Sequence, residues 1–218
     1  MVYQLDEKVL AFPDPHFGEK DGLIAVGGDL SIDRLLLAYS YGIFPWYSFK
    51  NEPIMWWCPM KRFVIFPEEI HISHSMKQLM KSERYRVSVN EAFKEVMINC
   101  GKAEGRNEME GAWLGDNMIE AYTELHRQGF AASVEVWDDD RLVGGLYGVN
   151  IGNSFFGESM FSLEPNTSKL ALITLAMLME DSGGIIDCQF ETSHLKSMGG
   201  RYISYEEYMD IIKGQDDF

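Results

Sequence analysis

Two polar residues stand two positions apart in a short apolar run near the C-terminal end, Ile185-Ile-Asp187-Cys-Gln189. We predict a strand here. Alternate side chains of a strand share a face, so Asp187 and Gln189 should point one way and Ile186 and Cys188 the other. Burying a carboxylate and an amide is costly unless both find partners. The pair is therefore either a reacting site or a polar pair at an exposed strand end, and the spacing by itself favours the second.

A further carboxylate lies among apolar residues in the stretch Phe155-Phe-Gly157-Glu158-Ser-Met160-Phe161. Burial raises the pKa of an unpaired carboxyl group, which suits acid–base chemistry or the binding of a cation. Gly157 would let another group approach the backbone closely. A structural Glu158, hydrogen-bonded to nearby backbone, is an equally good interpretation.

Aromatic and basic side chains could contact a nucleic acid. Tryptophans such as Trp46 and Trp113 could stack on a base, at ~1–3 kcal/mol each, although tryptophan is more often part of a core. The stretch 63–102 has a net charge of +1, whereas the whole chain has −15. The densest basic group lies in this stretch and is either a nucleic-acid contact or a solvated helix face: Lys77, Lys81, Arg84 and Arg86.

Several classes of protein are disfavoured. The three cysteines fit neither a disulfide nor a zinc pattern, and no further ligand joins His71 and His74, so we expect no metal. The longest apolar run, Leu170–Met179, is too short for a membrane span, which needs about 20 residues. Residues 1–12 do not resemble a signal peptide. We expect a cytoplasmic protein without a membrane segment or cofactor.

The elements around these residues predict an α+β fold of layered helices on a mostly antiparallel sheet. Residues 12–30 read as a loop, followed by a helix that Ser31 caps and Gly42 ends, and by aromatic segments of irregular structure. From Arg62 onward strands and helices alternate. We therefore predict a small N-terminal lobe over residues 1–62 and a larger domain over residues 63–218.

The predicted elements of the larger domain follow hydrophobic periodicity and capping residues. The strands are Arg62–Phe66, Tyr85–Val89, Ala132–Trp137, Leu142–Val149, Ser154–Gly157 and Ile185–Gln189. The helices are Ser73–Glu83, one that Asn90 caps and that ends near Cys100, one that Asp116 caps and that ends at Gly129, Ser168–Ser182, and Ser204–Lys213.

Taken together and in order, the motifs from about Phe12 to Tyr208 resemble the leucyl/phenylalanyl-tRNA–protein transferases. The motifs are Gly-Gly-Asp29-Leu-Ser, Gly42-Ile-Phe-Pro-Trp46, Trp56-Trp57-x-Pro59, Ser133-Val-Glu135-Val-Trp137, Leu142-Val-Gly-Gly-Leu-Tyr-Gly-Val149, Gly157-Glu-Ser-Met-Phe-Ser162, Asn166-x-Ser-Lys169 and Ile186-Asp-Cys-Gln189. The resemblance implies a GNAT-type acyltransferase domain, that is, one with the fold of the acetyl-CoA-dependent N-acetyltransferases.

The same resemblance implies a reaction and a set of site residues. Members take Leu or Phe, sometimes Met, from aminoacyl-tRNA and transfer it to proteins that begin with Arg or Lys, which marks them for degradation. The implied catalytic residues are Asp187, Gln189 and Glu158. Trp46 and Trp113 fall on positions that line the terminal-adenosine site, and Leu146, Gly157 and Met160 on the pocket for the transferred side chain. We expect a monomer.

The donor ester is already reactive, so direct attack by the acceptor amine fits better than an acyl-enzyme, since no Ser-His-Asp or Cys-His arrangement stands out. We expect Gln189 to bind the amine, Asp187 to polarise Gln189, and Glu158 to help hold the cationic N-terminal residue. An acetyl-CoA-dependent N-acetyltransferase is the main alternative, but residues 164–168 lack the glycines of a pyrophosphate loop. A non-catalytic RNA-binding module would need a more basic surface.

Overall fold

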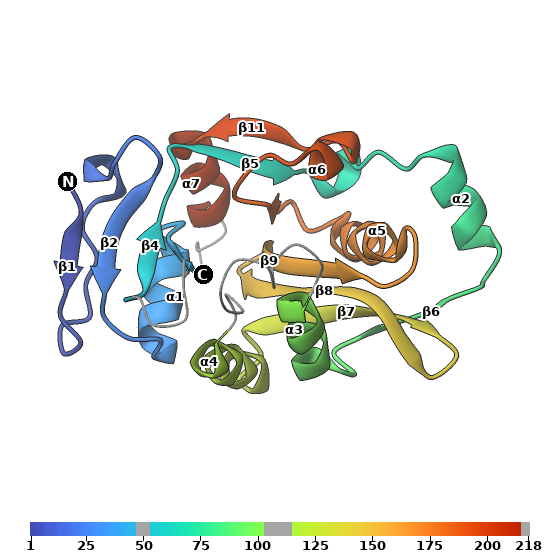
Figure 1. Ribbon diagram of the computed structural model, residues 1–218. Helices are drawn as coiled ribbons and strands as arrows, with labels where there is room; N and C mark the ends of the chain where they lie inside the picture. Colours follow the sequence, from blue (N-terminus) through green and yellow to red (C-terminus); the bar gives the residue numbers. More distant parts are fainter. Residues whose placement is uncertain (47–52, 103–114, 215–218) are drawn as a thin grey trace.

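The described parts of the chain form two sheets flanked by helices, so the fold is mixed α/β with mostly antiparallel sheets (Figure 1). This computed structural model describes residues 1–46, 53–102 and 115–214 of the 218-residue chain. None of the helices within these ranges is both long enough and apolar enough to cross a membrane.

The smaller sheet lies at the N-terminal end and has the strand order β1–β2–β4–β3. Its strands are β1 Tyr3–Leu5, β2 Leu23–Gly27, β3 Phe44–Trp46 and β4 Met55–Trp57. Only β1 and β2 are parallel. The sequence predicted a loop over 12–30 and irregular aromatic segments, which is wrong for β2, β3 and β4. Two of these strands have three residues each, too few to show a period-two pattern.

The larger sheet has the strand order β11–β5–β10–β9–β8–β7–β6, and only β9 and β10 are parallel neighbours. Its strands are β5 Lys61–Ile65, β6 Arg86–Val89, β7 Ala131–Asp138, β8 Arg141–Ile151, β9 Ser154–Ser162, β10 Ile186–Asp187 and β11 Arg201–Ser204. Strand β5 begins two residues before the boundary between lobe and domain that the sequence predicted.

Helices cover both faces of the larger sheet. Helix α5, Thr167–Met179, packs on β7, β8 and β9, and α3, Phe93–Lys102, packs on the same strands from the opposite face beside α4, Asp116–Arg127 (Figure 1). The remaining helices are α1 Ile32–Ser40, α2 His74–Lys81, α6 Ser193–Ser197 and α7 Tyr205–Lys213, with short 3-10 turns η1 Pro15–Phe17 and η2 Pro67–Glu69.

Each face of the larger sheet therefore has its own core. One core lies under α5, and the other continues into the smaller sheet, since it contains Trp56 of β4 together with Tyr208 of α7. This shared core fixes the N-terminal strands beside the larger sheet.

Most predicted elements of the larger sheet are confirmed to within a few residues, but three local predictions are wrong. The strand predicted over Ile185–Gln189 contains only Ile186 and Asp187, because Gln189 has a φ of 57°, which is not a strand conformation, although its carbonyl still accepts a hydrogen bond from the Phe63 N–H of β5. Asn90 does not cap α3; its side chain accepts a hydrogen bond from the Ser133 backbone. Asp116 lies in the first turn of α4, whose cap residue is Gly115. The α6 helix and β11 went unpredicted.

A β-bulge interrupts the pairing of β8 with β9. Tyr147 pairs with Ser159 and Gly148 pairs with Gly157, so Glu158 is the extra residue on β9. A bulge bends its strand and redirects the side chain of the unpaired residue. A Cβ atom at Gly148 would lie 2.1 Å from the Phe156 carbonyl oxygen, so only glycine fits opposite the bulge.

We expect Gly148→Ala to lower the free energy of unfolding by roughly 1–3 kcal/mol or more, because backbone and not a flexible side chain blocks the new methyl group. Urea titration followed by circular dichroism measures the change. Gly115→Ser is the control, since the φ of Gly115 is −74°, its Cβ would meet no described atom within 4 Å, and serine is a good residue for the cap position that Gly115 holds on α4. Equal stability of the two variants would show that the bulge adjusts freely.

Candidate active site

A buried ion pair joins Arg62 of β5 to Asp187 of β10. The Arg62 Nε donates to the Asp187 Oδ2 at 3.0 Å, and the two side chains are 1% and 0% exposed. Such a pair is stable in the interior only when further hydrogen bonds satisfy both groups. Here the Tyr208 hydroxyl donates to the Asp187 Oδ2 at 2.8 Å, and Arg62 Nη2 donates to the Gly42 carbonyl and to the Tyr208 oxygen.

The second carboxylate oxygen of Asp187 fixes the start of the next segment. Asp187 Oδ1 accepts a hydrogen bond from the backbone N–H of Gln189 at 2.9 Å. This bond closes a turn between the Asp187 side chain and the backbone two residues on, and the chain then leaves the strand direction at Gln189, whose φ is positive. The predicted sharing of one strand face by Asp187 and Gln189 is therefore wrong, but the two residues are in direct contact through the backbone.

Glu158 lies at the β9 bulge and accepts hydrogen bonds from two buried tyrosines. The Tyr39 hydroxyl of α1 donates to Oε1 at 2.6 Å, and the Tyr122 hydroxyl of α4 donates to Oε2 at 3.3 Å. The two hydroxyl oxygens also lie within hydrogen-bonding distance of each other, and because the pair has two protons for three contacts, one proton is shared between two acceptors. Glu158 is half-buried, whereas both tyrosine side chains are completely buried.

The surroundings of Glu158 raise the pKa of its carboxyl group to about 7. Burial is the largest cause, and the nearby negative charge of Asp187 adds to it, while the hydrogen bonds from Tyr39 and Tyr122 and the charge of Arg62 act in the opposite direction. Glu158 therefore exchanges its proton near neutral pH. This is the property expected of a group that performs acid–base chemistry.

Aromatic side chains surround the segment that carries Gln189. Phe190 lies 5.9 Å from Phe44 and 5.9 Å from Trp46, measured between ring centroids, and Trp46 also contacts Trp57. Trp46 is 43% exposed, so part of its side chain is not covered by the described residues. Trp113, the other tryptophan singled out from the sequence, lies outside the described residues.

Two residues predicted for the apolar pocket, Leu146 and Met160, lie on the face of the larger sheet that α5 covers, opposite the face where Glu158 meets α1 and α4. Leu146 and Met160 are direct cross-strand partners on β8 and β9, and both pack in the core under α5. A Cβ atom at Gly157 would lie 3.3 Å from the Asp187 carbonyl oxygen, so Gly157 is the predicted pocket residue that approaches Asp187, next to where β9 pairs with β10.

The buried thiols nearby are not reactive. Burial raises the pKa of the Cys58 thiol to about 12 and also raises that of Cys188, so neither is ionised at neutral pH. The described residues include no cluster of three or more His, Cys, Asp or Glu side chains placed to hold a metal ion.

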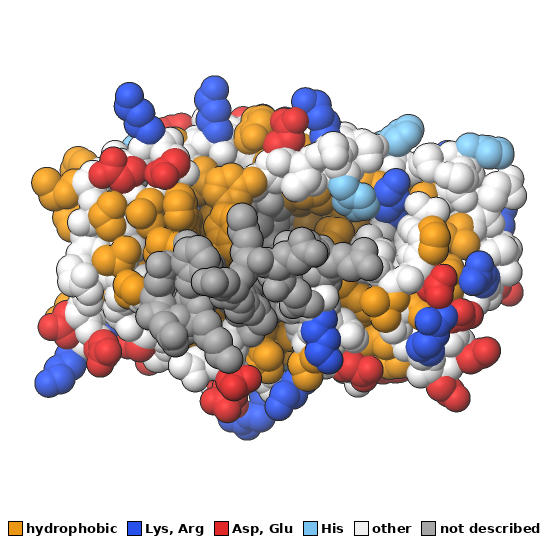
Figure 2. All heavy atoms as spheres, viewed as in Figure 1, with side chains coloured by type: hydrophobic (Ala, Val, Ile, Leu, Met, Phe, Trp, Pro, Cys, Tyr) orange, Lys and Arg blue, Asp and Glu red, His pale blue; other side chains and the backbone are white. Residues whose placement is uncertain are grey.

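The four basic residues predicted to contact nucleic acid differ in their surroundings. Lys77 and Lys81 are exposed on α2, at the opposite end of the molecule from α1 and α7 (Figure 1). Arg86 instead pairs with Glu91 at 2.8 Å, and Arg84 lies 4.0 Å from Asp138. Figure 2 shows basic and acidic side chains mixed at the rim of one face, with hydrophobic side chains gathered in its left half.

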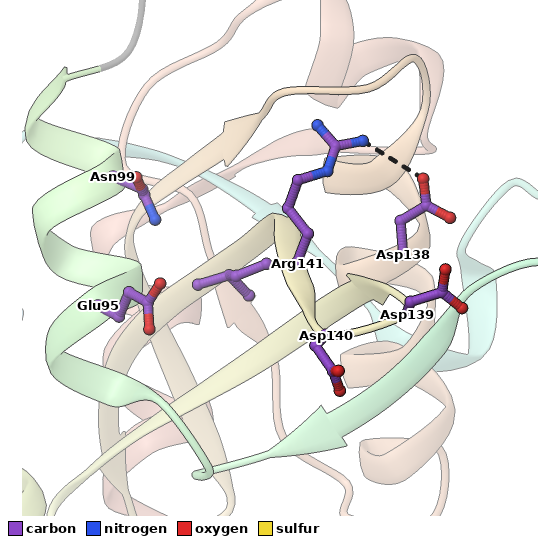
Figure 3. Close-up of a pocket in the computed structure, with 7 residues that line it drawn as sticks. Glu95, Asn99, Asp138, Asp139, Asp140 and Arg141 are labelled. Atoms are coloured by element: carbon purple, nitrogen blue, oxygen red, sulfur yellow. Dashed lines mark hydrogen bonds and ion pairs between the residues drawn. The ribbon is translucent and has the colours of Figure 1, made fainter.

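An acidic hollow of about 730 Å³ lies between α3 and the turn that joins β7 to β8 (Figure 3). Glu95 and Asn99 line it from the helix, and residues 138–142 line it from the turn. Arg141 is turned toward Asp138, at 3.3 Å. No residue predicted for the site lines this hollow.

Sequence reasoning missed Arg62, Tyr39, Tyr122 and Tyr208, which hold the carboxylates. An arginine at the start of the apolar run Arg62–Phe66 was a usable signal, since a charge in a buried strand needs a partner. The tyrosines carried no such signal, because a tyrosine on an apolar helix face is normally core.

Comparison with known proteins shows similarity along most of the chain. A family model described as leucyl/phenylalanyl-tRNA protein transferase matches residues 64–213, and the model of the N-terminal domain of the same family matches residues 28–60. The leucyl/phenylalanyl-tRNA–protein transferase of Flavobacterium johnsoniae is 49% identical over 95% of this chain and 98% of its own length. That of Syntrophus aciditrophicus is 50% identical over 94% and 86%.

One solved structure is a distant match. A conserved protein of unknown function from Staphylococcus epidermidis aligns over 84% of this chain and 68% of its own length, at 9% identity and with a TM-score of 0.39. This similarity is too low to support an argument about the fold or the site.

We expect Arg62→Met to lower the free energy of unfolding by ~3–5 kcal/mol, because the Asp187 carboxylate would remain buried without its cation. Arg84→Met, which removes an exposed arginine, should change it much less. Chemical denaturation of both variants measures the difference. The double variant Arg62→Met/Asp187→Leu should recover part of the loss, since no charge is then left unpaired. Equal effects of Arg62→Met and Arg84→Met would contradict the role of the ion pair.

Proposed function

The chain belongs to the leucyl/phenylalanyl-tRNA–protein transferase family, and we propose that it transfers an apolar amino acid from aminoacyl-tRNA to the α-amino group of an acceptor protein. The observation that carries this proposal is the presence of two neighbouring carboxylates with different surroundings. Asp187 of β10 is held by Arg62, and Glu158 of β9 has a pKa raised to about 7. Aminoacyl transfer needs an oriented amine and a group that exchanges protons near neutral pH.

The donor ester would bind beside the aromatic group of Trp46, Trp57, Phe44 and Phe190. The exposed face of Trp46 suits stacking on the terminal adenine, and base stacking contributes ~1–3 kcal/mol. Gln189, next to Phe190, would then lie near the ester and hydrogen-bond the attacking amine. We propose Trp113 as a second aromatic wall of this subsite.

The transferred side chain would enter the apolar region on the α5 face, past Gly157. Leu146 and Met160 would line it, and the absence of a side chain at Gly157 would leave room for the Cβ end of the amino acid. An apolar pocket discriminates by only ~1–3 kcal/mol per methylene. We therefore propose that Leu, Phe and Met are all accepted.

The reaction would proceed by direct attack of the amine on the ester carbonyl carbon. The thiols of Cys58 and Cys188 are protonated at neutral pH, so they do not offer a nucleophile for an acyl-enzyme. Asp187 would act by fixing the backbone of Gln189 and not by contact with its amide side chain.

The acceptor would be a protein or peptide that begins with Arg or Lys, whose transfer product is directed to degradation in the cytoplasm. A cationic N-terminal residue suits the carboxylates of the site and the chain's charge of −15. We propose that the protein acts as a monomer, without a cofactor.

The larger sheet is proposed to be a GNAT-type acyltransferase domain over residues 63–218, with residues 1–62 as a small lobe that completes the donor subsite. Antiparallel strands followed by the parallel pair β9–β10 suit this assignment. The acetyl-CoA-dependent alternative is less favoured, because the segment before α5 contains no glycine that would cradle a pyrophosphate.

The test is incubation of the protein with leucyl-, phenylalanyl- or methionyl-tRNA and an Arg-starting peptide, followed by measurement of the peptide mass. We expect one added residue with at least one donor, and none with aspartyl-tRNA. Acetyl-CoA is the parallel donor, which would add an acetyl group if the alternative were correct. Absence of an added residue with all three apolar donors would refute the proposal.

We expect Asp187→Ala and Glu158→Ala each to lose most of kcat/KM in this assay while circular dichroism shows a folded protein. Glu91→Ala is the control, because Glu91 is an exposed carboxylate paired only with Arg86. Full activity of both site variants would show that neither Asp187 nor Glu158 is needed for the transfer reaction.

The tRNA body is proposed to contact the stretch that carries Lys77, Lys81, Arg84 and Arg86. An otherwise acidic protein should use few phosphates, about two to four, with each contributing −0.7 to −0.9 to the slope of log K against log salt. Lys77→Ala/Lys81→Ala should flatten this slope and raise KM for aminoacyl-tRNA, but not for a short aminoacyl-adenosine donor. Arg127→Ala is the control and should keep the parental slope, since Arg127 lies on α4, outside this stretch, and pairs with Glu124. A parental slope in the double variant would place the contact elsewhere.

A further inference from the structure

Peptide-bond formation requires that the acceptor nitrogen lose two protons, if the proposed aminoacyl transfer is correct. An α-ammonium group has a pKa of about 8, so it is mostly protonated at neutral pH and has no free electron pair. In the reaction the N–C bond forms and the ester C–O bond breaks. One proton ends on the departing ribose oxygen and the other in water, so a group of the site must first accept a proton from nitrogen.

Asp187 is poorly suited to accept that proton. It is completely buried, and its two oxygens already accept hydrogen bonds from Arg62, Tyr208 and the Gln189 backbone. Protonation of Asp187 would leave the Arg62 guanidinium buried without its counter-charge, which is strongly unfavourable. Asp187 is therefore committed to holding Arg62, Tyr208 and the Gln189 backbone in place.

Gln189 is unsuited for a different reason. A neutral amide side chain donates through nitrogen and accepts through oxygen, but it has no site that holds a proton at neutral pH. Gln189 can orient the amine by hydrogen bonding and cannot store its proton.

Glu158 has the required properties. It is a half-buried carboxylate on the same side of the sheet as Asp187, and the bulge in β9 aims it at α1 and α4. We propose that Glu158, held by the hydroxyl groups of Tyr39 and Tyr122, accepts the proton from the α-ammonium group of the acceptor. The cation that meets Glu158 is then the α-ammonium itself. Tyr39 and Tyr122 are positioning residues, because they act through Glu158.

The charged and titratable groups near Glu158 come from several elements. They are Tyr39 of α1, Tyr122 of α4, Arg62 of β5 and Asp187 of β10, with Tyr147 of β8 and Tyr208 of α7 behind them. Both tyrosine hydrogen bonds stabilise the ionised form of Glu158 and so lower its pKa against the effect of burial. Loss of either hydroxyl must raise that pKa, and activity that needs ionised Glu158 must then begin at higher pH.

The pH dependence of kcat/KM for an Arg-starting peptide, with leucyl-tRNA as donor, tests whether loss of a tyrosine hydroxyl moves the onset of activity to higher pH. We expect Tyr39→Phe to move the acidic limb upward by about one pH unit. Tyr122→Phe should move it less, because its hydrogen bond is 3.3 Å long against 2.6 Å for Tyr39. The acceptor amine titrates identically in every measurement, so a difference between variants reports a group of the enzyme.

Tyr205→Phe is the matched control, since it removes a buried hydroxyl that donates to the Tyr41 carbonyl and does not contact Glu158. The acidic limb of its pH profile of kcat/KM should have the same midpoint as that of the unmodified protein. Glu158→Gln should lower kcat ~10²–10⁴-fold and leave only the titration of the amine. Should Tyr39→Phe fail to fold, Tyr122→Phe still decides the matter.

The proposal is overturned if both tyrosine variants keep the original midpoint, or if Glu158→Gln retains the original rate. These outcomes differ from failure of the proposed function itself. In that case the unmodified protein would transfer no residue from any aminoacyl-tRNA, and there would be no pH profile to compare.

Discussion

The ion pair between Arg62 and Asp187 is the constraint on which the site depends. It is buried, and it joins β5 to β10 while the same arginine reaches the Gly42 carbonyl after α1 and the Tyr208 hydroxyl on α7. Because a buried charge is tolerated only with its partners in place, these four segments have one arrangement. The backbone turn at Gln189 follows, since its N–H is fixed by the same carboxylate.

The two carboxylates of the site differ because of their neighbours and not their chemistry. Asp187 faces a guanidinium, which is a full compensating charge at a fixed position. Glu158 faces two neutral hydroxyls. Their hydrogen bonds stabilise its ionised form less than burial destabilises it, so its pKa rises to about 7. A bulge of one residue in β9 brings about this difference, because it turns Glu158 toward the tyrosines of α1 and α4.

The sequence predicted the larger sheet well, because its strands and helices show clear periodicities and are long enough to be recognised. It also selected Asp187, Gln189 and Glu158, although partly through resemblance to a family. It could not predict the partners Tyr39, Tyr122 and Tyr208, since their contacts with the carboxylates cross up to 119 residues of chain. The short strands of the smaller sheet and the departure of Gln189 from β10 were likewise set by tertiary contacts, which no local pattern encodes.

The Arg62 cluster also has a consequence for synthesis of the chain. Its hydrogen bonds join residues 125 and 146 positions apart along the chain. A chain still emerging from the ribosome therefore holds Arg62 without its counter-charge until β10 has left the exit tunnel, and without its tyrosine partner until α7 has followed. Contacts of such high sequence separation form late in folding, since loop closure must precede them. A nascent chain that stops before α7 consequently lacks the Tyr208 hydroxyl that hydrogen-bonds Asp187 and Arg62, even though every β9 residue is present.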